Sequence, residues 1–178
     1  RMRLYVLVSL QNNIEKLIIG GADVYKPKVA IIGCGNFGRL HSNTIKKLDN
    51  FEILAYADIN RDAAEYCCKQ YSAKYYCEDY RRVLDDKDID AVFVCTTHDS
   101  HYTIGIDAIA AGKHVFMEKP LALTPAHCDS IKKAIEGTGL KFMVGHKMRL
   151  QPKIKKVKAE VKWPMIIVAR MMDNRWPD

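Results

Sequence analysis

The fold of this 178-residue chain is decided by the stretch Lys28-Val-Ala-Ile-Ile-Gly-Cys-Gly-Asn-Phe-Gly-Arg39. It joins a short apolar strand to a glycine-rich turn and then to a helix, with the glycine spacing G-x-G-x-x-G. In this motif Gly33 permits a tight turn, Gly35 lets the backbone approach a pyrophosphate, and Gly38 lets the helix pack closely on the strand. A helix N-terminus also attracts anions, so the loop predicts dinucleotide binding. The expected cofactor-binding residues here are Gly33, Cys34, Gly35, Asn36, Phe37 and Gly38.

An acidic residue, Asp58, ends the next apolar run, near the spacing expected for the carboxylate that binds the adenosine ribose. Asp58 would accept hydroxyl hydrogen bonds from NAD and repel the extra phosphate of NADP. We therefore expect NAD as the cofactor. NADP stays the alternative because Arg61 lies nearby.

Strand-like and helix-like segments alternate along the middle of the chain. Such alternation predicts an α/β fold, a Rossmann-type doubly wound parallel sheet with right-handed crossovers. The run at 89–95 is nearly all apolar, as expected for a strand covered by helices on both faces. The ligand should then lie at the carboxyl ends of the strands. The expected strands are 28–32, 51–57, 74–77, 89–95, 114–117 and 141–144, and the expected helices are 36–48, 61–71, 79–85, 100–111 and 125–136.

The sequence outside this pattern suggests two further parts. Residues 1–27 form an N-terminal extension or linker, with a candidate edge strand at 4–10 and a candidate helix at 13–19. Residues 28–150 form the dinucleotide-binding domain. Residues 151–178 begin an incomplete α+β second domain, with a short amphipathic helix opened by Pro152 and a strand-like run at 165–172. The apolar face of that helix carries Ile154, Val157 and Val161.

Composition narrows the function classes. Hydrophobic content of 48% with 28% charged residues is typical of a globular protein, and no apolar run approaches a membrane span of about 20 residues. The six cysteines show no metal-ligand spacing, so we expect no metal site and a reducing cytoplasm. Residues 141–178 hold ten Lys or Arg and three Asp or Glu, which accounts for the net charge of +7. A nucleic-acid partner is one interpretation; we favour the edge of an unfinished domain.

Three later segments place polar and ionisable side chains at the ends of expected strands. They are Cys95-Thr-Thr-His-Asp-Ser-His101, Ala111-Gly-Lys-His-Val-Phe-Met-Glu-Lys-Pro-Leu-Ala122 and Val144-Gly-His-Lys-Met-Arg-Leu-Gln-Pro152. Together with the glycine loop, they resemble the glucose–fructose oxidoreductase / inositol dehydrogenase (Gfo/Idh/MocA) family of NAD(P)-dependent oxidoreductases. The resemblance covers about residues 28–178, and the phrase Ala-Gly-Lys-His-Val-x-x-Glu-Lys-Pro is its most specific part.

The resemblance implies roles for individual residues. Lys119 matches the lysine that contacts the substrate hydroxyl and assists proton transfer beside the cofactor. Glu118 matches the neighbouring carboxylate on the cofactor side, and Arg149 matches an arginine near the substrate. Thr96, Thr97 and His98 match a loop, normally Thr-Pro-Asn, that runs along the cofactor. His101 matches a histidine at the next helix start, for which cofactor contact and a core or capping role are both open.

The implied function is hydride transfer between a nicotinamide cofactor and a secondary alcohol or ketone of a sugar or cyclitol. Such a reaction needs a base for the hydroxyl proton, which Lys119 would supply. The family's second-domain aspartate and histidine have no counterpart in this sequence, so a catalytically inactive NAD-binding regulatory or sensor module is the alternative. We expect no membrane partner, and a homo-oligomer for the full-length form.

Overall fold

The computed structural model describes residues 25–48 and 51–161. The strand and helix expected at 4–10 and 13–19, and the strand expected at 165–172, lie outside the described residues. Within the described ranges, strands and helices alternate as the sequence pattern predicts.

The described strands form one parallel sheet with the order β3-β2-β1-β4-β5-β6. This order confirms the Rossmann-type doubly wound fold. The chain moves outward from β1 in one direction and then from β4 in the other, so the strand order reverses between these two neighbours. A ligand crevice is expected at the carboxyl ends of the strands at this point. The strands are β1 (Lys28–Ile32), β2 (Glu52–Ala57), β3 (Tyr75–Cys77), β4 (Ala91–Val94), β5 (His114–Met117) and β6 (Phe142–Val144).

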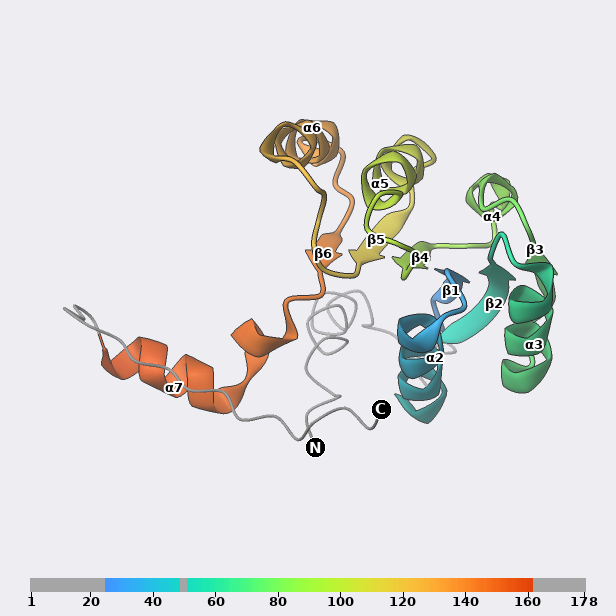
Figure 1. Ribbon diagram of the computed structural model, residues 1–178, viewed down its shortest axis with the longest axis horizontal. Coiled ribbons are helices and arrows are strands. Elements are labelled where there is room, and N and C mark those ends of the chain that lie inside the picture. Colours follow the sequence, from blue (N-terminus) through green and yellow to red (C-terminus); the bar gives the residue numbers. More distant parts are fainter. Residues whose placement is uncertain (1–24, 49–50, 162–178) are drawn as a thin grey trace. The chain divides into compact units, whose positions relative to one another are not determined.

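Helices cover both faces of the sheet (Figure 1). One face carries α2 (Asn36–Leu48) and α3 (Arg61–Tyr71), and the other carries α4 (Arg81–Asp85), α5 (His101–Ala110) and α6 (Pro125–Ile135). The layers explain why β4 is apolar almost throughout: Val92, Phe93 and Val94 are buried between them.

Local side chains set where the helices begin. The side chain of Asn60 accepts a hydrogen bond from the Ala63 amide at the start of α3. At the start of α6, Thr124 accepts from the His127 amide and Pro125 occupies the first turn. Each cap satisfies an amide that the helix itself leaves without a partner.

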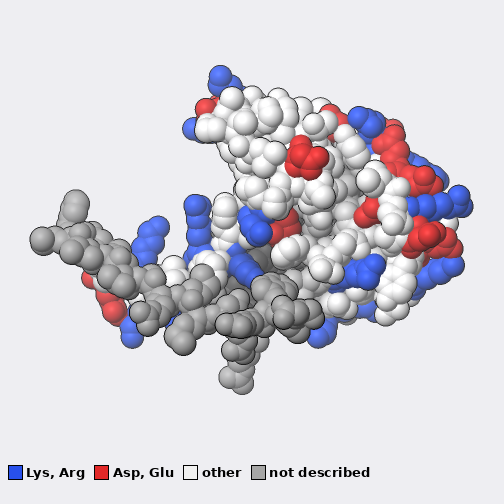
Figure 2. Space-filling view, in the orientation of Figure 1, with Lys and Arg blue, Asp and Glu red and all other residues white. Residues whose placement is uncertain are grey.

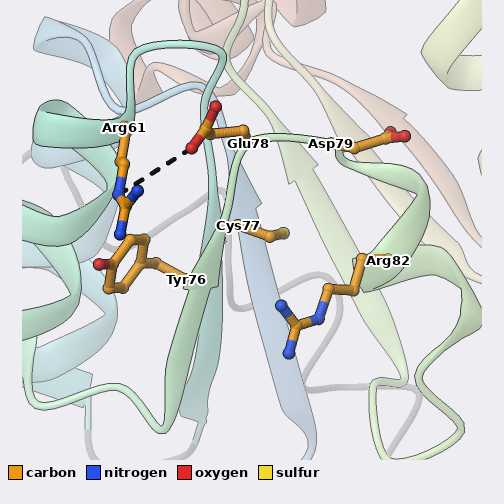
Figure 3. A pocket seen from close by; sticks show the side chains of 6 residues that line it. All are labelled: Arg61, Tyr76, Cys77, Glu78, Asp79 and Arg82. Carbon is orange, nitrogen blue, oxygen red and sulfur yellow. Dashed lines mark ion pairs between the residues drawn. The ribbon is translucent and has the colours of Figure 1, made fainter.

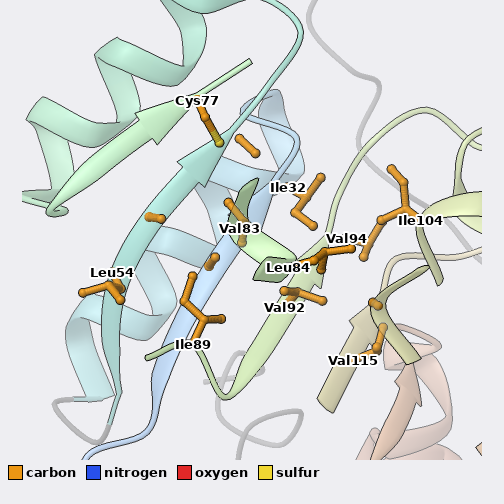
Figure 4. Packing of buried hydrophobic residues seen from close by; sticks show 14 of the residues in the cluster. Ile32, Leu54, Cys77, Val83, Leu84, Ile89, Val92, Val94, Ile104 and Val115 are labelled. Carbon is orange, nitrogen blue, oxygen red and sulfur yellow. The ribbon is translucent and has the colours of Figure 1, made fainter. Parts of the chain in front are cut away.

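The core has two parts, one on each face of the sheet. On the α4 and α5 face, Ile32, Val92 and Val94 pack with Leu84 and Ile104 (Figure 4). On the α2 and α3 face, the core includes Cys34 and Cys67 as buried free thiols. Burial on both faces holds the strands in place, so the loops at their carboxyl ends start from fixed positions.

A second compact unit begins at Lys147. It contains the 3-10 turn η2 (Lys147–Leu150) and α7 (Pro152–Glu160). The helix forms where the sequence predicts it, but Ile154, Val157 and Val161 are all exposed. Among the described helices, none is long and apolar enough to cross a membrane.

Candidate functional site

The turn after β1 requires glycine at two positions for reasons internal to the protein. Gly33 has φ +98°, and a Cβ there would lie 2.6 Å from the carbonyl oxygen of Cys95. A Cβ on Gly38 would collide with the carbonyl oxygen of Gly33. The first glycine thus lets the turn pass the end of β4, and the last lets α2 approach that turn.

The middle glycine is different. A Cβ on Gly35 would meet no protein atom within 4 Å, so nothing in the chain itself demands glycine there. The position faces open space before the N-terminus of α2, whose first-turn amides have no carbonyl partner in the helix. That turn contains no acidic side chain. The space and donors suit a pyrophosphate, and the cofactor named by the motif therefore fits this loop.

Asp58 ties the glycine loop to the loop after β2. Its Oδ2 accepts a hydrogen bond from the Cys34 amide at 2.7 Å, and its Oδ1 accepts from the Asn60 amide at 2.8 Å. A carboxylate has about four lone-pair sites, so each oxygen keeps capacity for one ribose hydroxyl. Asp58 can therefore shape the loop and bind a ligand at once.

Cys34 lies in the glycine loop with its side chain turned into the protein. Its side chain is buried, its amide donates to Asp58, and its carbonyl accepts a 3.0 Å hydrogen bond from Arg39 Nε. Burial raises the pKa of the Cys34 thiol, with the nearby Cys67 and Asp58 adding to the effect. Cys34 thus shapes the loop through its backbone, and any cofactor contact it makes is through the backbone as well. Asn36 and Phe37 are exposed on the same loop.

Glu118, at the end of β5, is buried and paired with His41 of α2. His41 Nε2 lies 2.7 Å from Glu118 Oε1, and the His41 ring packs against Phe116 at 4.9 Å between ring centroids. Burial alone raises the pKa of Glu118. The hydrogen bond and charge of His41, with the Lys119 amide and charge, outweigh burial and lower that pKa. An ionised carboxylate only accepts, so His41 Nε2 carries the proton of this hydrogen bond.

Lys119 follows directly and is exposed. Its amide donates to Glu118 Oε2 at 3.2 Å, while its Nζ lies 5.5 Å from the centroid of the Phe37 ring. This cation–π contact brings the lysine of the β5 loop to the glycine loop. Lys119 is thus held at its backbone by a buried carboxylate and keeps its amino group accessible.

His101 is fully buried at the start of α5 and links two loops of the site. Its Nδ1 lies 2.7 Å from the Pro120 carbonyl oxygen, and its Nε2 lies 3.2 Å from that of Thr96. Both ring nitrogens face backbone carbonyls, which favours the core role over the cofactor contact. His101 positions the Thr96 loop relative to the turn that follows Lys119.

The remaining predicted residues lie in three settings. Thr96 is half-buried, and its hydroxyl accepts a 2.7 Å hydrogen bond from Ser100. Thr97 and His98 are exposed in the same loop. Arg149 belongs to the second unit, on η2, and is exposed there. In the described part of the chain, no group of three or more His, Cys, Asp or Glu side chains is placed to hold a metal ion.

Sequence reasoning missed His41 and Gly145. A Cβ on Gly145 would lie 3.3 Å from Glu118 Oε1, so this glycine leaves room for the buried carboxylate. His41 gave one weak signal: it lies three positions after Gly38, on the helix face that packs against the sheet.

The glycine loop, the carboxylate after β2 and the open space at the start of α2 define a dinucleotide-binding domain. Residues 27–146 match the model of the oxidoreductase family with an NAD-binding Rossmann fold. The chain belongs to this family, the Gfo/Idh/MocA oxidoreductases, and NAD is the cofactor of the matched domain.

Relatives with assigned names support this membership. The chain is 35% identical over 141 residues to inositol 2-dehydrogenase of Paracoccus denitrificans, covering 75% of this chain and 42% of that protein. It is 33% identical over 131 residues to an uncharacterized oxidoreductase, YrbE, of Bacillus subtilis, covering 74% and 38%. The chain thus spans about two fifths of these relatives.

Solved structures give the same result. The scyllo-inositol dehydrogenase of Lactobacillus casei, determined with bound NAD(H) and scyllo-inositol, is 27% identical and superposes with a TM-score of 0.71. The match covers 76% of this chain and 40% of that one. The shared part is the dinucleotide-binding domain.

Proposed function

We propose that this chain supplies the cofactor-binding half of an NAD-dependent dehydrogenase acting on a secondary alcohol of a sugar or cyclitol. The observation that carries the proposal is the meeting of two loops: Lys119 Nζ lies over Phe37 of the glycine loop. A cofactor bound at that loop and a substrate placed beside it would both be within reach of this amine. Relatives named inositol dehydrogenases support the substrate class.

Within this proposal, the glycine loop and Asp58 hold the cofactor, which accepts or supplies hydride when bound. Lys119 takes the hydroxyl proton of the alcohol or returns it to the ketone. The buried Glu118–His41 pair fixes the backbone of Lys119, and His101 fixes the turn after it. Arg149 is proposed to contact the substrate.

A catalytically inactive NAD-binding sensor remains the second candidate. It is supported by the glycine loop and Asp58, whose open space and remaining acceptor capacity suit NAD without any contribution from Lys119. Such a module would use Asp58 and the glycine loop without depending on Lys119. For either function we propose a cytoplasmic protein, supported by the buried free thiols, and a full-length homo-oligomer.

The proposal is tested first by fluorescence titration of the full chain with NADH. Wild type should bind at micromolar concentration, and Asp58→Ala should bind about tenfold or more weakly because two charge-assisted ribose contacts are lost. Asp62→Ala, an exposed acid on the neighbouring helix turn, serves as the matched control and should keep wild-type affinity. Absence of NADH binding by a folded wild-type chain would overturn the proposal.

Lys119→Ala separates the dehydrogenase from the sensor. With inositols and NAD, hydride transfer should fall about 100-fold or more, since a positioned base contributes that much, while NADH binding survives. Lys141→Ala removes an exposed lysine at the other end of the sheet and should leave turnover unchanged. Equal turnover in Lys119→Ala would remove the catalytic assignment, and NADH binding without turnover in wild type favours the sensor.

A further inference from the structure

A second feature lies at the same end of the sheet as Asp58. An open groove of about 500 Å³ follows the end of β3. The Asp58 amide donates to the Cys77 carbonyl at 3.1 Å, and Ala57 pairs with Cys77 in the sheet, so Glu78 follows beside Asp58. The groove is lined by Arg61, Tyr76, Cys77, Glu78, Asp79 and Arg82.

Arg61 and Glu78 form an ion pair in this groove (Figure 3). Its Nε lies 4.0 Å from Glu78 Oε1, and the two side chains are 66% and 60% exposed. A hydrogen bond with Tyr76 raises the pKa of Arg61, and the negative charge of Glu78 adds to this effect. An ion pair this exposed is weak, so a competing anion or a substitution shifts it easily.

The neighbouring arginines are also engaged. Arg81 lies 3.4 Å from Asp79, and the Arg82 guanidinium lies 5.3 Å from the centroid of the Tyr75 ring. Acidic and basic side chains accordingly alternate on the side of the molecule that carries α3 and α4 (Figure 2). The guanidinium nearest to Asp58 in the chain is that of Arg61, three positions later.

The Arg61–Glu78 pair bears on the choice between NAD and NADP because the two cofactors differ in charge. NADP differs from NAD by a phosphate on the adenosine ribose, the sugar that Asp58 is expected to hold. A phosphate carries about −1.5 to −2 charges and is bound best by an arginine fork. Arg61 keeps further N–H donors that could reach such a phosphate, but Glu78 already offsets part of its positive charge.

We propose that Glu78 is a specificity-determining residue that disfavours NADP by pairing with Arg61. Asp58 favours NAD by binding the ribose hydroxyls. Glu78 disfavours NADP by offsetting the positive charge of Arg61, which would otherwise attract the 2′-phosphate. This inference rests on the proposed function, in that the dinucleotide lies with its adenosine ribose at Asp58.

The test compares NADH and NADPH titrations of the full chain in wild type, Glu78→Gln, Arg61→Gln and the double variant at low salt. Glu78→Gln should raise the affinity for NADPH relative to NADH by about threefold to fivefold, the size expected for one exposed ion pair. In the Arg61→Gln background the same substitution should change that ratio little. Asp79→Asn removes an equal charge from the same groove and should change the ratio less than about twofold, since Asp79 pairs with Arg81.

Each other result overturns the inference. An unchanged ratio in Glu78→Gln shows that Glu78 does not discriminate. An equal gain in Asp79→Asn, or a full gain without Arg61, shows that summed charge acts rather than the pairing. If a folded wild type binds neither cofactor, the proposed function fails together with this inference, whereas NADH binding with an unchanged ratio overturns the inference alone.

Discussion

The polar side chains at the two ends of the parallel sheet differ in how they use their hydrogen-bonding groups. At the amino end, the buried Lys113 Nζ donates to the carbonyl oxygens of Asp86 and Ile89 at 2.6 and 2.8 Å. Next to it, His114 Nδ1 accepts from the Lys141 amide at 3.0 Å. These hydrogen bonds of Lys113 and His114 are made with backbone groups of the protein.

At the carboxyl end, several polar groups remain available to a ligand. Both oxygens of Asp58 can accept a further hydrogen bond, Lys119 keeps an exposed amino group, and Gly35 borders open space. One sheet therefore has an end that stabilises the fold and an end that can bind a ligand. Substitutions at the amino end should therefore lower stability alone, whereas substitutions at the carboxyl end can lower stability, ligand binding or both.

The largest effect is expected where the carboxyl end serves both purposes. Gly33→Ala should lower the free energy of unfolding by about 3 kcal/mol or more, because it combines a positive φ with a contact to the Cys95 backbone that cannot yield. Gly35→Ala, the matched control, should keep stability and lose NADH affinity. Thermal unfolding with NADH titration checks both, and a stable Gly33→Ala would contradict the steric argument.

The amino end should show the reverse pattern. Lys113→Met keeps the apolar stem but removes both donors to buried carbonyls, at an expected cost of about 1–3 kcal/mol in unfolding free energy. NADH affinity of the folded protein should not change. Urea unfolding and NADH titration measure the two quantities, and a weakened NADH affinity at equal stability would break the division between the two ends.

Sequence pattern predicted a doubly wound parallel sheet covered by helices because period and glycine spacing are local signals. The ends of elements depended on side-chain contacts that the period does not show. α4 begins at Arg81 rather than 79, since Asp79 Oδ1 accepts the Arg81 amide before the helix starts. β4 begins at Ala91 rather than 89, since the Ile89 amide bonds to Asp86 in a turn.

Part of the candidate site follows from signals of the same local kind. The glycine loop and Asp58 are defined by spacing, and Lys119 by family resemblance. His41 and Glu118 lie 77 positions apart in the sequence, and nothing in the sequence pattern indicates that they form a pair. Likewise, the buried place of His101 follows from the meeting of two loops rather than from its own helix.

The buried His41–Glu118 pair lies at the carboxyl end of the sheet, yet it is hydrogen-bonded within the protein and should contribute to stability. His41→Leu removes the donor and should cost about 1–3 kcal/mol of stability by leaving a buried carboxylate oxygen unpaired. His41→Gln keeps an amide donor and should recover much of that loss. Thermal unfolding of both variants at neutral pH is the measurement, and equal losses would show that ring packing against Phe116 matters rather than the hydrogen bond.

The smallest effect is a pH dependence at the amino end. Burial lowers the pKa of His114 from 6.5, and the positive charge of Lys141 opposes the raising effect of Asp90. Between the lowered value and 6.5 the unfolded chain binds a proton that the folded chain does not, so stability falls as pH decreases through this window. His114→Asn keeps an acceptor for the Lys141 amide and does not titrate, so its unfolding midpoint should change less between pH 7.5 and 5.5, about one unit on either side of 6.5. Parallel pH profiles of the two proteins would show instead that His114 binds its proton equally in both states, and that the amino end stabilises the fold without sensing pH.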